Sequence, residues 1–296
     1  MANDFSLIDL KGLSEPLTKL VDSVSKGIGV LYEPIAKVRN AKADAASMLI
    51  LADAKEKVDE LTYRALERVT YQAVRRQRNI DSIVHGAAKY LPDEVSTEEV
   101  DEDWLVNFFN LGQDVGNDEM QIIWSKLLAG EVARPGSFKA RTVNAVKSLS
   151  AEEANLFTVL CGFSFKIDGG EWVLPIFSHD FFSYIRANGF SVASEVHLKS
   201  IGLLSANEIW YGSSRSDRKI PLEYHSTEFL AFPDESEDDD DDYDDDDDDE
   251  IQGGFIQAFP FTETGMELAR IAGGKPDFNY LKILLDNGSL EPFEDE

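Results

Sequence analysis

Between Ile35 and Leu91 the sequence contains no proline and a single glycine, Gly86, which lies near the end of the stretch. Apolar residues recur in it every three or four positions, as they do on one face of an α-helix. A continuous helix of this length would reach roughly 85 Å, which is longer than a compact domain of this size can cover. The pattern therefore predicts a long helical arm within residues 1–92, made of one helix or two collinear helices.

Small residues form much of the apolar stripe of this arm, so a second helix can approach it closely. Two interpretations remain open: an antiparallel hairpin within one chain, and a coiled coil between copies of the chain. We expect a homo-oligomer. The residues predicted to mediate self-association are Val38, Ala41, Ala45, Met48, Ala52, Leu61, Ala65 and Val69.

Two shorter amphipathic patterns fill residues 101–143. Gly112 can end the first helix and Asn117 can cap the second. Only about four residues separate these helices, so we expect them to pack antiparallel within a helical bundle over residues 93–163. Aromatic and leucine residues at helical spacing indicate a core far more often than a cofactor site. The predicted core residues are Trp104, Phe108, Trp124, Leu127 and Leu128.

The sequence QIIWSKLLAGEVARPGSF (residues 121–138), followed by RTV and by Leu149–Ala154, resembles a bacterial family known only as a domain of unknown function. That family is often likened to abortive-infection proteins of the Abi-alpha type. Residues 13–45 are also similar to the N-terminal segment of such proteins. The resemblance covers about the first half of the chain. It implies a role in phage defence and brings no catalytic residues with it.

After residue 163 the pattern changes to short strands and helices. Asp168-Gly169-Gly170 is a hairpin signal, residues 181–188 and 191–201 are predicted helices, and residues 224–232 are a predicted strand. Two helices followed by strands and a last helix resemble a winged-helix module. We therefore predict a mainly α, overall α+β protein with a C-terminal winged-helix-like module and a small antiparallel sheet over residues 164–290.

Residues 234–250 contain 15 acidic residues and no basic one, which is more than half of the formal net charge of −28. Like charges with almost no apolar residues cannot form a core, so this stretch is predicted to be a disordered insertion in the module. The rest of the chain is moderately acidic, which disfavours a general affinity for phosphate backbones. Five arginines between Arg64 and Arg78 are typical of a solvated helix face; contact with nucleic acid or with the acidic insertion is the alternative.

Catalytic chemistry finds no support in the sequence. The four histidines lie in no zinc-binding spacing, and no glycine-rich phosphate loop occurs. Ser178, His179 and Asp180 are adjacent, but neighbouring side chains point apart, so we interpret them as a turn before a helix and not as a catalytic triad. We expect no catalytic, cofactor-binding or metal residues, and hence no enzyme.

The single cysteine, Cys161, cannot form an intramolecular disulfide, which suits a reducing cytoplasm. The N-terminus shows no secretory signal pattern and no stretch reaches 18 apolar residues, so we expect a cytoplasmic protein. Residues 27–32 could enter a membrane interface as part of an amphipathic helix, although Asp22 and Glu33 beside them disfavour this.

The preferred hypothesis is a non-enzymatic, oligomeric interaction protein whose partners are its own copies and other proteins. The alternatives are a nucleic-acid-binding regulator that uses the winged-helix-like module and an effector that perturbs membranes through its N-terminal helices. In a winged helix, residues 191–201 would enter the major groove. The only cationic side chain there is Lys199, beside His197 and opposed by Glu195, so we expect the module to recognise protein and not DNA.

Overall fold

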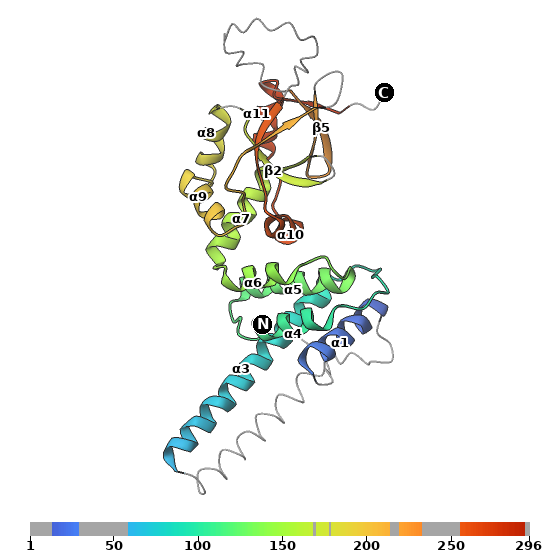
Figure 1. The fold of residues 1–296 in the computed structure, drawn as a ribbon, viewed down its shortest axis with the longest axis vertical. Coiled ribbons are helices and arrows are strands. Elements are labelled where there is room, and N and C mark those ends of the chain that lie inside the picture. Colours follow the sequence, from blue (N-terminus) through green and yellow to red (C-terminus); the bar gives the residue numbers. More distant parts are fainter. Residues whose placement is uncertain are drawn as a thin grey trace, which may run out of the picture. The chain divides into compact units, whose positions relative to one another are not determined.

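The computed structural model describes residues 14–29, 59–167, 170–177, 179–213, 219–232 and 255–293. Five of the predicted self-association residues, from Val38 to Ala52, and the acidic insertion lie outside these ranges. The contacts divide the chain into two units, residues 1–150 and residues 151–296 (Figure 1). The predicted boundaries after residues 92 and 163 differ from this division, and independent folding of three domains stays a prediction.

Helices make up the described part of unit 1. They are α1 (Glu15–Ile28), α3 (Glu60–Tyr90), α4 (Glu102–Gly112), α5 (Asp118–Ala133) and α6 (Ala140–Ser148). Acidic or amide side chains cap three of them: Asp59, Asp101 and Asn117 accept from backbone N–H groups three residues ahead. The cap at Asn117 is the predicted one. The cap at Asp59 means that residues 35–91 are not one continuous helix, because Asp59 is extended and a new helix begins at Glu60.

Aromatic side chains of α4 and α5 form the core of unit 1. Phe108 stacks on Trp104 with ring centroids 5.1 Å apart and meets Trp124 at 5.0 Å. The Trp104 indole N–H donates to the carbonyl of Phe138 at 2.7 Å, so its one polar atom is satisfied. All five residues predicted for this core are buried, including Leu127 and Leu128.

We expected α4 and α5 to pack on each other as an antiparallel hairpin, but this is not their main contact. Instead α4 lies chiefly against α1, and α5 lies chiefly against α3. Two glycines, one in α1 and one in α3, explain why these helix pairs are in close contact. A Cβ atom on Gly27 of α1 would lie 2.5 Å from the ring of Phe109, and one on Gly86 of α3 would lie 2.2 Å from Ser125 Oγ. Each N-terminal helix therefore approaches its partner more closely than a residue with a side chain would allow.

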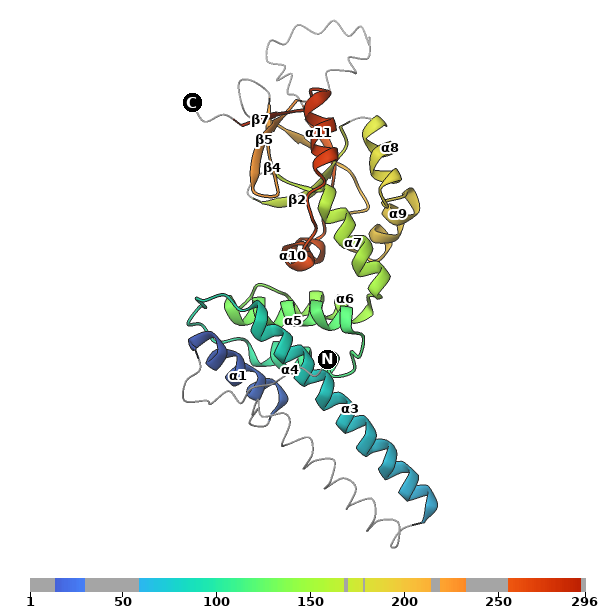
Figure 2. The same ribbon diagram turned by 180° about the vertical axis from the view of Figure 1, so that it is seen from behind.

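Helix α3 is divided into a packed half and an exposed half. Its last third contributes Ile80, Ile83, Val84 and Ala87 to the core, whereas residues 60–78, the outer half of α3, contribute no buried side chain. Figures 1 and 2 show this half extending well beyond the other described helices of the unit. The helical arm exists in this form, although its described part is shorter than predicted.

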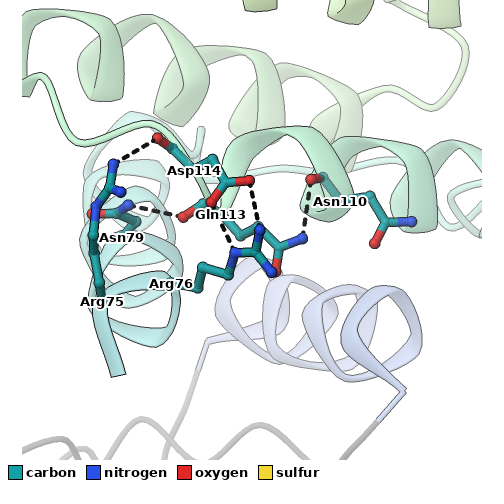
Figure 3. A network of polar contacts seen from close by, with 6 residues as sticks. All are labelled: Arg75, Arg76, Asn79, Asn110, Gln113 and Asp114. Atoms are coloured by element: carbon teal, nitrogen blue, oxygen red, sulfur yellow. Dashed lines mark hydrogen bonds and ion pairs between the residues drawn. The ribbon is translucent and has the colours of Figure 1, made fainter. Parts of the chain in front are cut away.

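A polar network fixes α3 where it enters the core (Figure 3). The guanidinium of Arg76 donates to both carboxylate oxygens of Asp114, at 2.8 and 3.1 Å, and Arg75 donates to the Asp114 carbonyl at 3.3 Å. Asn79, which is buried, donates to the carbonyl of Gln113 at 2.8 Å. The arginines predicted to lie on a solvated face thus include two that hold the turn between α4 and α5.

Unit 2 combines helices with one sheet. Its elements are α7 (Ala151–Phe163), β1 (Phe165–Ile167), β2 (Glu171–Pro175), α8 (His179–Ala187), α9 (Val192–Ser200), β3 (Ile209–Gly212), β4 (Ile220–Tyr224), β5 (Thr227–Ala231), β6 (Phe255–Pro260), α10 (Glu263–Ala272), α11 (Phe278–Asp286) and β7 (Leu290–Pro292). The sheet has the order β3-β6-β2-β1-β4-β5-β7, and every pair is antiparallel. The predicted fold class, mainly α and overall α+β with an antiparallel sheet, is confirmed.

The predicted strand over residues 224–232 is present as β5 (Thr227–Ala231), but its predicted start is wrong, because residues 224–226 belong to the end of β4 and to a turn. Tyr224 ends β4, Thr227 begins β5, and His225 and Ser226 connect them with φ values of 47° and 69°. Two-residue hairpins need such left-handed residues, and Asn-Gly is the usual sequence signal for them. A histidine and a serine occupy these positions here, so the turn carried no recognisable signal.

Candidate interaction surface

Residues 191–201, which we expected to enter the major groove if the module were a winged helix, contain helix α9 (Val192–Ser200). Ser191 begins it with a capping box shared with Ser194, and Leu198 anchors it in the core. Two valines at positions i and i+4 point outward instead: Val192 is 50% exposed and Val196 is 59% exposed. The outward face of α9 is therefore partly apolar.

Both basic side chains of α9 are engaged with carboxylates. His197 Nε2 lies 2.7 Å from Oε1 of Glu153 on α7. Lys199 Nζ donates to Glu195 Oε1 at 2.8 Å and lies 3.6 Å above the ring centre of Phe259, a strand residue of β6. Lys199 is thus held against the protein by an ion pair and a cation–π contact. Because phosphate contacts supply most of the affinity for DNA, this helix is poorly equipped to bind it.

Strands β3 and β6 expose two large aromatic side chains. Trp210 on β3 is 63% exposed and Phe255 on β6 is 48% exposed. Trp210 pairs with Gln257, and Gly212 pairs with Phe255. Residues two apart on a strand share a face, so Trp210, Phe255 and Phe259 lie on the same face of the sheet. A Cβ atom on Gly212 would lie 2.8 Å from the Phe255 ring, so the glycine lets that ring cover the strand.

Lys199 brings helix α9 into contact with strand β6. It lies over Phe259 of β6, and Val196 and Val192, three and seven residues earlier, share its side of α9. We call Val192, Val196, Trp210 and Phe255 the α9–β3 surface. Sequence reasoning missed it as a unit. The signal was present as a valine pair four apart in a predicted helix and a tryptophan in the following strand.

The predicted self-association residues that the structure describes lie together on the outer half of α3. Leu61, Ala65 and Val69 follow one another at four-residue spacing, and all three are exposed, Leu61 by 71%. The other five predicted residues are outside the described ranges. The described part of the stripe is accessible to another helix.

Unit 2 also contains a cavity of about 500 Å³ beside the β4–β5 turn. It is lined by Lys166 and Glu223, whose side chains are 2.8 Å apart, and by Trp172, His225 and Arg270, among others. Burial and the neighbouring Lys166 lower the pKa of His225, so its ring is neutral at pH 7. Its Nε2 atom is buried and has no hydrogen-bond partner in the part of the chain that the structure describes.

Cys161 borders this cavity, and burial raises its thiol pKa far above the ordinary range. A thiol held in its protonated form is a poor nucleophile. The triad-like run at residues 178–180 falls outside what can be described, since Ser178 and the side chains of His179 and Asp180 are not placed. Within the described ranges, no three His, Cys, Asp or Glu side chains gather as a metal site would require.

Among the described helices, none combines the length and the hydropathy needed to cross a membrane. Of residues 27–32, the candidate for entry into a membrane interface, residues 30–32 lie outside the described ranges. In helix α1, which ends within this segment, Leu20 and Val24 are buried in unit 1. They contribute to the protein core and are not available for lipid.

A family model described as a protein of unknown function (DUF2806) matches residues 63–285, which span α3 to α11. No curated protein and no solved structure matches the chain.

Proposed function

The chain belongs to the DUF2806 family, whose description gives no function, and on this premise we propose that it is a non-enzymatic interaction protein that binds a protein partner through the α9–β3 surface. One observation carries the proposal. Both basic side chains of α9 are engaged with carboxylates, and the large apolar side chains that reach solvent on α9, β3 and β6 include two valines, a tryptophan and a phenylalanine. Exposed aromatic side chains are enriched in protein interfaces, where they contribute much of the binding energy.

Self-association through the outer half of α3 is the second part of the proposal. Leu61, Ala65 and Val69 are exposed on a helix that has no buried residue over its first 19 positions. A helix with such a stripe gains stability when another helix covers it. We place this oligomer in the bacterial cytoplasm. A role in phage defence rests on the resemblance of residues 13–45 and 121–154 to Abi-alpha-type proteins, and the DUF2806 match adds nothing to it.

A nucleic-acid-binding regulator is the alternative that the topology favours. A winged-helix module runs helix, strand, helix, helix, strand, strand. Unit 2 contains α7, β2, α8, α9, β3 and β6 in that order, with β6 between β3 and β2 in the sheet, although β1 precedes β2 and β4 and β5 lie between β3 and β6 in the sequence. The side-chain chemistry of α9 opposes this alternative. A membrane effector has less support, because the apolar face of α1 is buried.

Site-specific photocrosslinking in cells tests the docking proposal. A photoreactive residue is placed at Val196, and a matched control is placed at Phe278, which is 72% exposed on α11 of the same unit. We expect discrete protein adducts at position 196 that are absent at 278. Val192→Glu in the same chain should remove them. Adducts that contain nucleic acid, or identical adducts from both positions, would refute the proposal in favour of DNA or of nonspecific contact.

A further inference from the structure

The two ends of the seven-stranded sheet differ in how they meet solvent. At one end β7 is three residues long, contains Pro292, and carries Glu291, which forms an ion pair with Lys219. A proline and a charge are the usual devices that prevent another strand from pairing with an edge. This end of the sheet is protected.

The opposite end lacks these devices. Strand β3 has the sequence Ile-Trp-Tyr-Gly, with no proline and no charged residue, and it pairs with β6 on one side only among the described strands. Ile209 and Trp210 expose 44% and 63% of their surface, one on each face of the strand. An edge of this kind offers backbone donors and acceptors together with apolar side chains, which is the combination that binds an extended peptide.

We propose that β3 accepts an extended segment of the partner as an additional strand of the sheet. The inference rests on the proposed docking function and adds the form and the chemistry of the partner. Backbone hydrogen bonds along β3 supply the affinity, and the side chains of the added strand supply the specificity. The partner residues opposite Ile209 and Trp210 are apolar, because each meets an exposed apolar neighbour across the strand pair.

The chemistry of the next position is set by Glu208. This exposed residue immediately precedes β3, and its carboxylate accepts a hydrogen bond from the side chain of Gln257 on β6. Gln257 pairs with Trp210, so Glu208 and Trp210 share a face, two residues apart. The partner residue opposite Glu208 is therefore basic. Every strand pair of this sheet is antiparallel, so the added strand is taken to run antiparallel to β3. The sequence that fits then has two adjacent apolar residues, opposite Trp210 and Ile209, followed by a lysine or arginine opposite Glu208.

Charge also selects a foreign strand over a second copy of the chain. Unit 2 has 33 acidic and 9 basic residues, so it carries −24 of the formal net charge of −28, and pairing of two β3 edges would bring two strongly acidic units together. Unit 1, which contains α3, carries only −4. A self-paired β3 would also leave Glu208 without a basic residue opposite it, because Ile209 to Gly212 contain none. A basic partner gains from the same field that opposes self-pairing.

Hydrogen exchange of the full chain with a defined probe tests the inference. The probe is the peptide acetyl-Thr-Thr-Val-Val-Lys-Thr-amide, compared with its Lys→Glu version and with a version N-methylated on both valines. We expect the first peptide to bind and to slow amide exchange in residues 209–212. The Lys→Glu peptide should bind roughly threefold to tenfold more weakly, with a difference that shrinks in high salt. The N-methylated peptide should not bind, because it cannot complete the ladder.

Matched variants assign the effect to β3. Trp210→Thr retains a good strand residue and should weaken binding roughly tenfold. Phe278→Thr removes another well-exposed aromatic ring, on α11, and should leave binding unchanged. Equal binding by the N-methylated peptide would overturn strand addition, and equal binding by the Lys→Glu peptide would overturn the basic partner. Self-association that depends on Trp210 would show that a second copy occupies the edge. Adducts at Val196 without protection of β3 would leave the docking function intact and refute this inference alone.

Discussion

Replacing Gly86 with alanine sets two effects of known size against each other. In an exposed helix the change would stabilise the protein by about 1 kcal/mol, because alanine is the better helix former. At this position the new Cβ would lie 2.2 Å from Ser125 Oγ and 2.8 Å from Ser125 Cβ. Turning the hydroxyl away relieves only the first contact, so α3 and α5 must also separate.

The cost of that separation exceeds the gain. Overpacking of a close interface costs about 1–3 kcal/mol, and moving Ser125 breaks its 2.9 Å hydrogen bond to the Ile83 carbonyl, which contributes about 1 kcal/mol. We therefore expect Gly86→Ala to lower the free energy of unfolding of unit 1 by about 1–3 kcal/mol. Amide exchange in α5 as a function of urea measures this quantity for unit 1 separately from unit 2.

A second substitution tests the cause. Ser125→Gly removes both atoms that the new methyl group would meet and moves the glycine to the other helix. On its own this change should destabilise the protein through helix propensity and the lost hydrogen bond. In the Gly86→Ala background it should cost roughly 1–2 kcal/mol less, which is the coupling that a double-mutant cycle reports. Additive effects, or a Gly86→Ala variant more stable than the wild type, would refute the close approach of α3 to α5.

Three further predictions concern other parts of the molecule. Ser226→Gly should stabilise unit 2 by about 0.5–1 kcal/mol, because glycine removes the cost of a left-handed serine. The control, Ser226→Ala, retains that cost. Equal amide exchange rates in β4 and β5 of the two variants would contradict the reasoning. Arg76 lowers the pKa of Asp114 through their hydrogen bonds. The stability that this pair contributes should therefore be present above about pH 4 and be lost as the pH falls through the lowered pKa of Asp114 in the folded protein. Urea titrations of wild type and Asp114→Asn should therefore converge in acid, and a gap of under about 1 kcal/mol is expected at pH 7 because both groups are well exposed. Leu61→Glu with Ala65→Glu should shift light scattering towards the monomer without changing the helix content, and an unchanged mass would remove α3 from the assembly.

Local signals predicted much of the secondary structure. The cap at Asn117 and the aromatic stripes of α4 and α5 depend on residues only a few positions apart, so the chain itself displays them. The start of α3 at Glu60 was missed because an aspartate cap inside a periodic helical pattern is hard to distinguish from a solvated residue. The β4–β5 turn was missed because His225 and Ser226 are not the residues that usually adopt left-handed conformations.

The candidate site depends on information that sequence order does not contain. Glu195 and Lys199 are one helical turn apart, but the contact of Lys199 with Phe259 joins positions 60 residues apart, and that of His197 with Glu153 joins different helices. These contacts decide that α9 presents valines and not cations. Gly27 and Gly86 likewise revealed their roles only through the side chains opposite them, Phe109 and Ser125.

The place of β6 between β3 and β2 has a consequence for biosynthesis. Unit 1 comprises residues 1–150, so it can complete its core while the ribosome is still translating the second half of the chain. Strands β2 and β3 are made early in unit 2, but the strand that joins them begins only at Phe255, after the acidic insertion. During that interval the apolar edge of β3 has no partner on either side among the strands already made. The run of 15 acidic residues is synthesised during this wait, and its charge opposes association between neighbouring nascent chains until β6 closes the sheet.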